Sequence, residues 1–176
     1  MNVLRFDVDP LPGYHPEYGL MLAMMQDGTR EWREELGEIE PEGIVWQVAP
    51  DSYSIGGVLL HIAECEVHWF DTFLQGKAMD PAEEKLLMSE EIQQYEGKWP
   101  IPPKEPLSYY YDILDGVRAR TLESFKTMGD PREAKPHSSR AEEFSLGWVL
   151  SHVVTHESYH GGQAVLLKEL YRRSKS

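Results

Sequence analysis

Histidines recur at four-residue intervals near the end of this 176-residue chain, at His152, His156 and His160. The segment has helical periodicity, and successive residues of a helix lie about 100° apart around its axis. His156 and His160 therefore differ by about 40°, so both imidazoles can reach one metal ion. His152 lies about 80° from His160, which makes it a poorer ligand and a better neighbour of the site.

The segment 156–160, His-Glu-Ser-Tyr-His, also matches the HExxH pattern of zinc metalloproteases. In those enzymes the intervening glutamate, here Glu157, is a general base, and the third zinc ligand comes from further along the chain. Only 16 residues follow His160, they contain no histidine, and their one carboxylate, Glu169, lies on the same expected helix. The sequence therefore disfavours a protease and predicts that the third ligand comes from upstream.

An internal resemblance indicates where that ligand lies. The segment 53–62, Tyr-Ser-Ile-Gly-Gly-Val-Leu-Leu-His-Ile, aligns with 144–153, Phe-Ser-Leu-Gly-Trp-Val-Leu-Ser-His-Val, at an offset of 91 residues. An aromatic residue followed by serine is a common start of a helix, which explains part of the match. The shared glycine and histidine favour a bundle with pseudo-two-fold symmetry, in which the two segments occupy equivalent places. His61 would then face the same interior as His152.

On the helix that carries His61, Glu64 lies about 60° away and His68 about 20° away, so the three side chains can share one face. Helical bundles build metal sites from facing helices, and imidazole nitrogen suits zinc or nickel. His61, His156 and His160 would supply three ligands and leave further positions for water or substrate. The alternative is that these histidines are buried core residues with no ligand role.

The bulk composition excludes several classes of protein. The chain has 30 acidic and 17 basic residues, a net charge of −13, which argues against a nucleic-acid partner. No apolar run approaches the 18 residues of a membrane-spanning helix, and the N-terminus has no signal-peptide pattern. Cys65 is the one cysteine, so no intrachain disulfide can form; a small buried residue is a better interpretation of it than a soft ligand or a reactive thiol. We expect a cytoplasmic protein without membrane contacts.

The apolar periodicity predicts an all-α four-helix bundle as a single domain over residues 1–176. Residues 1–16 carry three prolines and a glycine, so an irregular N-terminal arm is expected. The connection 76–106 is too long for a hairpin and should cross the bundle, with a short helix starting at Pro81. A polar loop is expected over 132–143. The predicted helices span about 17–36, 55–74, 107–128 and 145–172.

These motifs resemble the DinB-like (YfiT-like) superfamily. The resemblance rests on an aromatic-Ser start followed by Leu-x-His-Ile-x-Glu, and some 90 residues later on Trp-x-Leu-x-His-Val-x-x-His-Glu-x-x-His-x-Gly-Gln. It implies an up-down-down-up bundle, often a homodimer, with a long crossover between the second and third helices. It also implies one divalent ion, usually nickel or zinc, held by His61, His156 and His160. The family's His-Arg-Gly-Gln turn differs here, because Gly161 stands where the arginine is usual.

The family includes S-transferases and isomerases that use low-molecular-weight thiols such as bacillithiol or mycothiol, and many members have no known activity. The resemblance therefore implies a metal-dependent transferase or hydrolase, in which the ion activates a thiol or water against a small electrophile. Glu157 or Glu64 would act as proton acceptor or orient a ligand. The alternative is a non-catalytic, metal-binding dimer that serves as a stress-response or binding protein. The two hypotheses differ in whether the ion has a position at which water or thiol exchanges.

Overall fold

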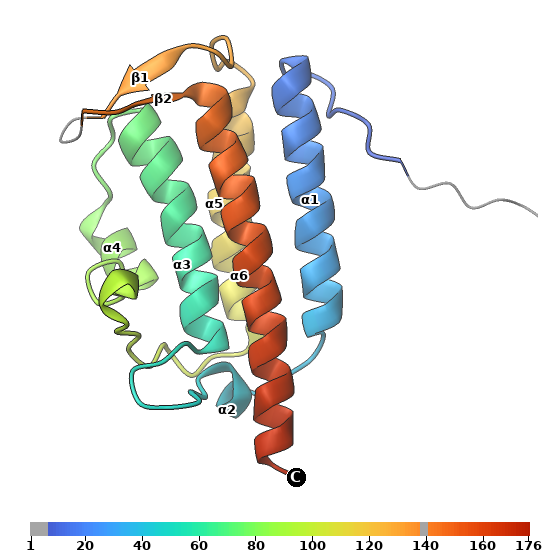
Figure 1. Cartoon of the computed structure of the whole chain (residues 1–176), viewed down its shortest axis with the longest axis vertical. Helices are drawn as coiled ribbons and strands as arrows, with labels where there is room; N and C mark the ends of the chain where they lie inside the picture. The colour runs from blue at the N-terminus through green and yellow to red at the C-terminus, as the bar shows by residue number, and fades with distance from the viewer. Residues whose placement is uncertain (1–6, 138–140) are drawn as a thin grey trace, which may run out of the picture.

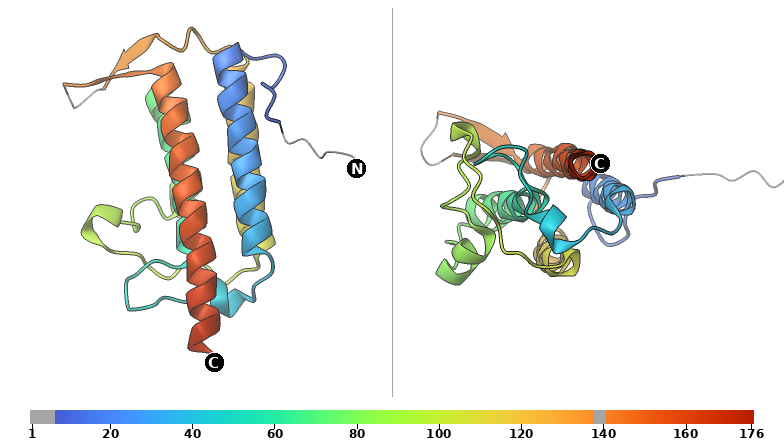
Figure 2. Two further views of the ribbon diagram at one scale, coloured as in Figure 1. Left: turned by 45° about the vertical axis from the view of Figure 1, so that its right-hand side comes forward. Right: turned by 90° about the horizontal axis from the view of Figure 1, so that it is seen from below.

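The computed structural model describes residues 7–137 and 141–176 and is built around four long helices. They are α1 (Pro16–Leu36), α3 (Ile55–Val67), α5 (Leu107–Phe125) and α6 (Leu146–Ser174). α1 and α6 run in one direction and α3 and α5 in the other (Figure 1), so the predicted up-down-down-up bundle is confirmed. Seen from below, the four helices stand at the corners of a square (Figure 2). Residues 7–15 precede the bundle as an irregular arm; residues 1–6 of the predicted arm lie outside the described residues.

Serine side chains begin two of these helices. Ser54 Oγ accepts a hydrogen bond from the Gly57 backbone N–H at 3.2 Å, and Ser145 Oγ accepts one from the Trp148 N–H at 3.1 Å. Such bonds satisfy N–H groups that the first turn of a helix leaves without partners. The two caps are matching positions of the internal sequence resemblance. α3 and α6 therefore start in the same way, and they pack against each other.

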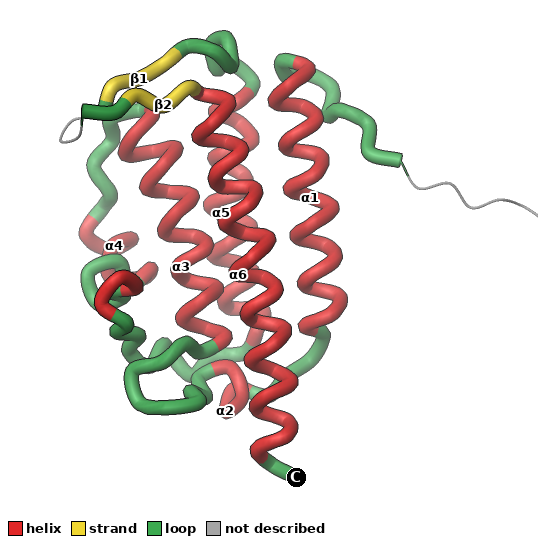
Figure 3. The backbone as a smooth tube through the Cα atoms, viewed as in Figure 1, coloured by secondary structure: helices red, strands yellow, loops and turns green. Residues whose placement is uncertain are grey.

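Three local features differ from the sequence prediction. The helix predicted over 55–74 changes at His68 into a π-helix, η1 (His68–Leu74), whose wider turns shift the direction of its side chains. A short helix that the sequence did not predict, α2 (Pro41–Ile44), begins at Pro41. The predicted polar loop contains a two-stranded antiparallel ribbon, β1 (Ala134–Pro136) paired with β2 (Glu143–Ser145). Figure 3 shows this ribbon at one end of the bundle.

The crossover between α3 and α5 returns the chain along the outside of the bundle. The two helices are parallel neighbours, so the chain must travel back the length of α3 before α5 can begin (Figure 1). The crossover contains the expected short helix, α4 (Pro81–Leu87), and a 3₁₀ turn, η2 (Gln94–Glu96). It then delivers Trp99, which is buried, onto α3. The crossover thus covers one side of the bundle beside α3.

The apolar core is divided into two clusters along the bundle. On α6, Val149 and Val153 belong to one cluster, and Ala164 and Leu167 to the other. The turn of α6 between them carries His156, Glu157 and His160, which are all buried. A polar layer therefore crosses the middle of the bundle, and buried polar groups are stable only where they find partners. Within residues 7–137 and 141–176, no helix is both long and apolar enough to span a membrane.

Candidate metal centre

Three histidines meet in the polar layer, two from α6 and one from α3. His156 and His160 lie one turn apart on α6, and His61 faces them from α3. One ring nitrogen from each lies within 4.8 Å of the others, and His61 Nε2 is 3.1 Å from His156 Nε2. Two nitrogens bound to one tetrahedral zinc ion at about 2.0–2.1 Å lie roughly 3.3 Å apart. The structure thus brings together the three histidines predicted from the sequence, in an arrangement that fits one divalent ion.

The hydrogen bonds of the rings leave nitrogen lone pairs directed at the centre. His160 Nδ1 donates to Gln163 Oε1 at 2.7 Å, whereas its buried Nε2 has no partner. His61 Nδ1 lies 3.6 Å from Glu64 Oε2, so this carboxylate is placed to orient the ring. Histidines that bind metals commonly have their second nitrogen held by an amide or carboxylate in this way. The unpartnered Nε2 of His160 is the clearest local sign of a ligand, because buried polar atoms are normally satisfied.

Burial also keeps two of the rings neutral. Burial, together with the neighbouring histidines, lowers the pKa of His156 from 6.5 to about 2. The same causes lower the pKa of His160 to about 4, against the small opposing effect of its bond to Gln163. Both imidazoles are therefore unprotonated at pH 7, which is the form that binds a metal ion.

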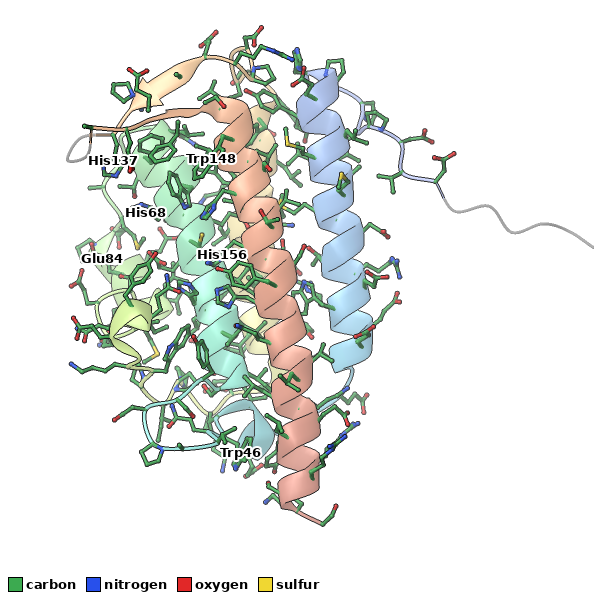
Figure 4. The ribbon with its side chains drawn as sticks, in the orientation of Figure 1. Trp46, His68, Glu84, His137, Trp148 and His156 are labelled. Carbon is green, nitrogen blue, oxygen red and sulfur yellow. The ribbon has the colours of Figure 1, made fainter. Side chains whose placement is uncertain are left out.

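A cavity of about 510 Å³ opens beside His61 and His156. Glu64 and Cys65 from α3 line it, as do Gln94 and Tyr95 from the crossover. Figure 4 shows Trp148, His68 and His137 near the end of the bundle that carries the ribbon, with His156 further along between α3 and α6. The volume is within the range of small-molecule sites. A ligand in this cavity would lie next to the histidine cluster.

Comparison with known families agrees with this geometry. A family model described as MST, mycothiol-S-transferase, matches residues 20–173, nearly the whole of the bundle. The chain belongs to the mycothiol S-transferase family. This family is part of the DinB/YfiT-like superfamily, so the resemblance noted from the sequence motifs is confirmed. None of the curated proteins compared matches the chain.

Glu157, which the sequence suggested as proton acceptor or orienting residue, lies in a different environment from the three histidines. Its Oε1 accepts hydrogen bonds from Thr29 Oγ1 at 2.5 Å and Trp32 Nε1 at 3.2 Å, and its Oε2 accepts one from Arg118 Nη2 at 2.5 Å. These donors belong to α1 and α5, so the carboxylate points away from the three histidines. Three donors, one of them a guanidinium, hold this carboxylate in place. The structure therefore separates Glu157 from the cavity.

Arg118 and Glu66 complete this second group of polar residues, and the sequence analysis missed both. Arg118 donates to both oxygens of Glu66, at 3.0 and 3.2 Å from Nε, while also binding Glu157. The signal that could have revealed them is a charged residue inside an apolar stripe: Glu66 is almost completely buried next to Cys65 and Val67. We call Thr29, Trp32, Glu66, Arg118 and Glu157 the ion cluster.

Gly161, which stands where the superfamily motif noted from the sequence has arginine, packs closely against Trp32. A Cβ atom at Gly161 would lie 2.5 Å from Trp32 Cγ, so the indole of Trp32 fills the space that any longer side chain would need. α1 and α6 pack closely there as a result. The same indole donates to Glu157. Trp32 therefore links the substitution at 161 to the ion cluster.

Two further candidates from the sequence lie in the cavity wall. The ring of His152 stacks on Trp148 with centroids 5.0 Å apart, and its centroid is 5.9 Å from that of His156, so it is a neighbour of the three-histidine group and not part of it. Cys65 is buried, and burial raises the pKa of its thiol. That thiol stays protonated at neutral pH, in keeping with a small buried residue.

Proposed function

We propose that this protein is a metal-dependent thiol S-transferase. In this proposal His61, His156 and His160 hold one zinc or nickel ion, and the cavity beside them receives a low-molecular-weight thiol, mycothiol by the family's name, together with a small electrophile. The observation that carries the proposal is the buried, unpartnered Nε2 of His160 in a three-histidine group whose other two members, His61 and His156, line an accessible cavity. The family membership supports the choice of a thiol as the nucleophile.

A divalent ion bound by the three imidazoles would lower the pKa of a thiol ligand and keep it as thiolate near neutral pH. The residues of the chain supply the remaining functions. Gln163 and Glu64 orient the rings of His160 and His61. Glu64, half-buried in the cavity wall, takes the thiol proton on its carboxylate oxygen and passes it to solvent. Trp99 packs edge-on against His61 with ring centroids 5.4 Å apart and excludes water from that side.

For Glu157 we propose a positioning role. The ion cluster ties α6 to α1 and α5 in the turn that carries His156 and His160. It thereby fixes the rotation of α6 that directs both rings toward His61. The sequence-based role of Glu157 as proton acceptor is assigned to Glu64 instead.

A non-catalytic metal-binding protein is the rival hypothesis. Such a site is usually closed by a fourth protein ligand, whereas catalytic sites keep a position open. Among residues 7–137 and 141–176, the histidine group offers three ligands. A cavity adjoins it, which favours catalysis. Water in place of a thiol would make the protein a hydrolase. Homodimer formation and cytoplasmic location stay predictions.

The test begins with elemental analysis of untagged protein that has never touched nickel resin. We expect close to one zinc or nickel ion per chain, and metal-dependent loss of iodoacetamide in the presence of mycothiol. His61→Ala should lose both. His68→Ala is the matched control for metal content, because His68 is exposed and lies outside the three-histidine group, although it lines the cavity. No bound metal after reconstitution, or full conjugation by His61→Ala, would overturn the proposal. Turnover of esters or amides without thiol would support the hydrolase instead.

A further inference from the structure

Aromatic rings form one continuous wall of the cavity. Phe144 stacks on Trp148 with centroids 4.6 Å apart, and Trp148 stacks on His152 at 5.0 Å, so the three rings form a column along the start of α6. Trp69 packs edge-on against Trp148 at 5.5 Å. All four residues line the cavity, and we call them the aromatic wall.

The wall is rigid and yet accessible. Trp148 is 44% exposed although its ring is held by neighbours on two sides. Trp69, which belongs to the π-helix η1, also packs against the Trp148 ring and helps to fix its position. Exposed aromatic surface that is already ordered loses little entropy when a ligand binds, and aromatic ligands gain from edge-to-face or offset contacts with it. This surface is suited to a flat, apolar group.

Other residues of the cavity lining have a different character. They include Glu64, Gln94 and Tyr95, and Tyr95 is almost completely exposed. These groups can hydrogen-bond to a hydroxylated thiol, which leaves the aromatic wall to the second substrate. The described residues that line the cavity include the carboxylates of Glu64 and Glu142 and no lysine or arginine, and the chain carries a net charge of −13. A charged ring bound against the aromatic wall would find no lysine or arginine among these described residues to pair with, so it would lose solvation without compensation.

We infer that the electrophile is an uncharged, flat aromatic compound bound against the wall formed by Trp69, Phe144, Trp148 and His152. This inference rests on the proposed S-transferase function and deepens it. With an activated aryl chloride, the thiolate sulfur attacks the carbon that bears chlorine. The carbon–sulfur bond forms, the carbon–chlorine bond breaks, chloride leaves, and the thiol proton goes to Glu64 and then to solvent. No oxidation or reduction occurs.

The activity test compares two aryl chlorides that differ in charge, 1-chloro-2,4-dinitrobenzene and the anion 4-chloro-3,5-dinitrobenzoate, with the metal-loaded full chain and mycothiol. After division by the uncatalysed rates, kcat/KM for the neutral compound should exceed that for the anion by about tenfold or more, which corresponds to one lost favourable contact or one repulsion. Equal values would overturn the inference.

Trp148→Ala separates the electrophile from the thiol. It should raise KM for the neutral aryl chloride about tenfold and change KM for mycothiol by less than about twofold, and kcat/KM for iodoacetamide, which has no ring, should fall by a much smaller factor. Trp148→Phe, which keeps an aromatic ring, should return KM for the neutral aryl chloride most of the way to the wild-type value. Leu166→Ala is the matched control, since Leu166 is an exposed apolar residue of α6 that does not line the cavity. An equal rise in KM for mycothiol would show that the wall binds the thiol and would overturn the inference.

A binding measurement keeps the inference testable without turnover. Quenching of tryptophan fluorescence reports binding of unreactive 1,3-dinitrobenzene and of the anion 3,5-dinitrobenzoate. We expect the neutral compound to bind at least about tenfold more tightly than the anion, and Trp148→Ala to weaken the binding of both rings. Preference for the neutral ring without any conjugation would overturn the proposed S-transferase function alone. Conjugation of iodoacetamide without this preference would overturn the inference alone.

Discussion

The histidine centre and the ion cluster share one polar layer and one turn of α6, but they differ in how far their hydrogen bonds are satisfied. In the ion cluster, Arg118 pairs with two carboxylates and every oxygen of Glu157 has a donor. In the histidine centre, His160 Nε2 is buried without a partner and a cavity lies alongside. Adjacent residues, His156 and Glu157, belong to opposite regions. Complete internal pairing indicates a structural role, and incomplete pairing beside a cavity indicates a site for a ligand.

His156→Ala should produce the largest change, complete loss of metal binding and of thiol conjugation. Only two imidazoles would remain, too few for a stable site in this group. The far-ultraviolet circular dichroism should stay helical, because the ion cluster is untouched. Metal content after dialysis measures the effect. Glu169→Gln, an exposed change on the same helix, should keep the metal. Stoichiometric metal in His156→Ala would show that His156 is not a ligand, and the histidine centre would then not differ from the ion cluster as a binding site.

Arg118→Met should have the largest effect on stability, a loss of about 3–5 kcal/mol in the free energy of unfolding. It leaves Glu66 and Glu157 buried without their cation. Urea denaturation of the metal-free protein measures it. Arg30→Met is the control, since Arg30 forms exposed ion pairs on α1 and should change stability by less than about 1 kcal/mol. Similar values for both variants would mean that the ion cluster does not stabilise the bundle.

The pH dependence of the metal-free protein should come from the histidine centre. The pKa values of His156 and His160 in the folded protein, about 2 and 4, lie below the ordinary value of 6.5. The unfolded chain therefore binds more protons below pH 6.5, and the stability present above that pH is lost as the pH falls. Each histidine contributes a slope of about 1 kcal/mol per pH unit between pH 6.5 and its folded pKa.

Denaturation at pH 7.0 and 5.5 measures this slope. The double variant His156→Ala, His160→Ala should flatten it, because no buried imidazole of α6 then has to stay neutral. Added zinc should raise the free energy of unfolding at pH 7. This gain should shrink as the pH falls, because protons then compete with zinc for the ring nitrogens. A slope unchanged in the double variant would assign the pH dependence to other groups.

The sequence was sufficient for the bundle and for the three histidines that meet. Helical periodicity predicts the four long helices, and the repeated start of α3 and α6 leads to His61. Sequence spacing was insufficient for Glu157. Helical spacing places it about 100° from His156, but it does not say that Thr29, Trp32 and Arg118 converge on that side. These donors, which come from two other helices, decide the direction of its carboxylate.

Local irregularities were missed for related reasons. Strands of three residues, such as Ala134–Pro136, are too short to show alternation. The π-helical turns at His68–Leu74 keep an apolar pattern close to that of an α-helix, so periodicity cannot separate them. Yet these turns carry Trp69 into the cavity wall. The shape of the aromatic wall thus depends on a feature that the sequence pattern does not encode.

Two glutamate-to-glutamine variants, one in the ion cluster and one beside the histidine centre, test the difference between the two regions most closely. Glu157→Gln should lower the free energy of unfolding by about 1–3 kcal/mol, since it weakens a buried bond to Arg118, and leave the metal affinity within about twofold. Glu64→Gln should change stability by less than about 0.5 kcal/mol, because Glu64 is partly exposed, and slow conjugation about a hundredfold. Denaturation curves and kcat/KM measured on the same preparations separate the two. If Glu157→Gln slowed conjugation at unchanged stability and metal content, its carboxylate would belong to the reaction, and the HExxH interpretation would be right after all.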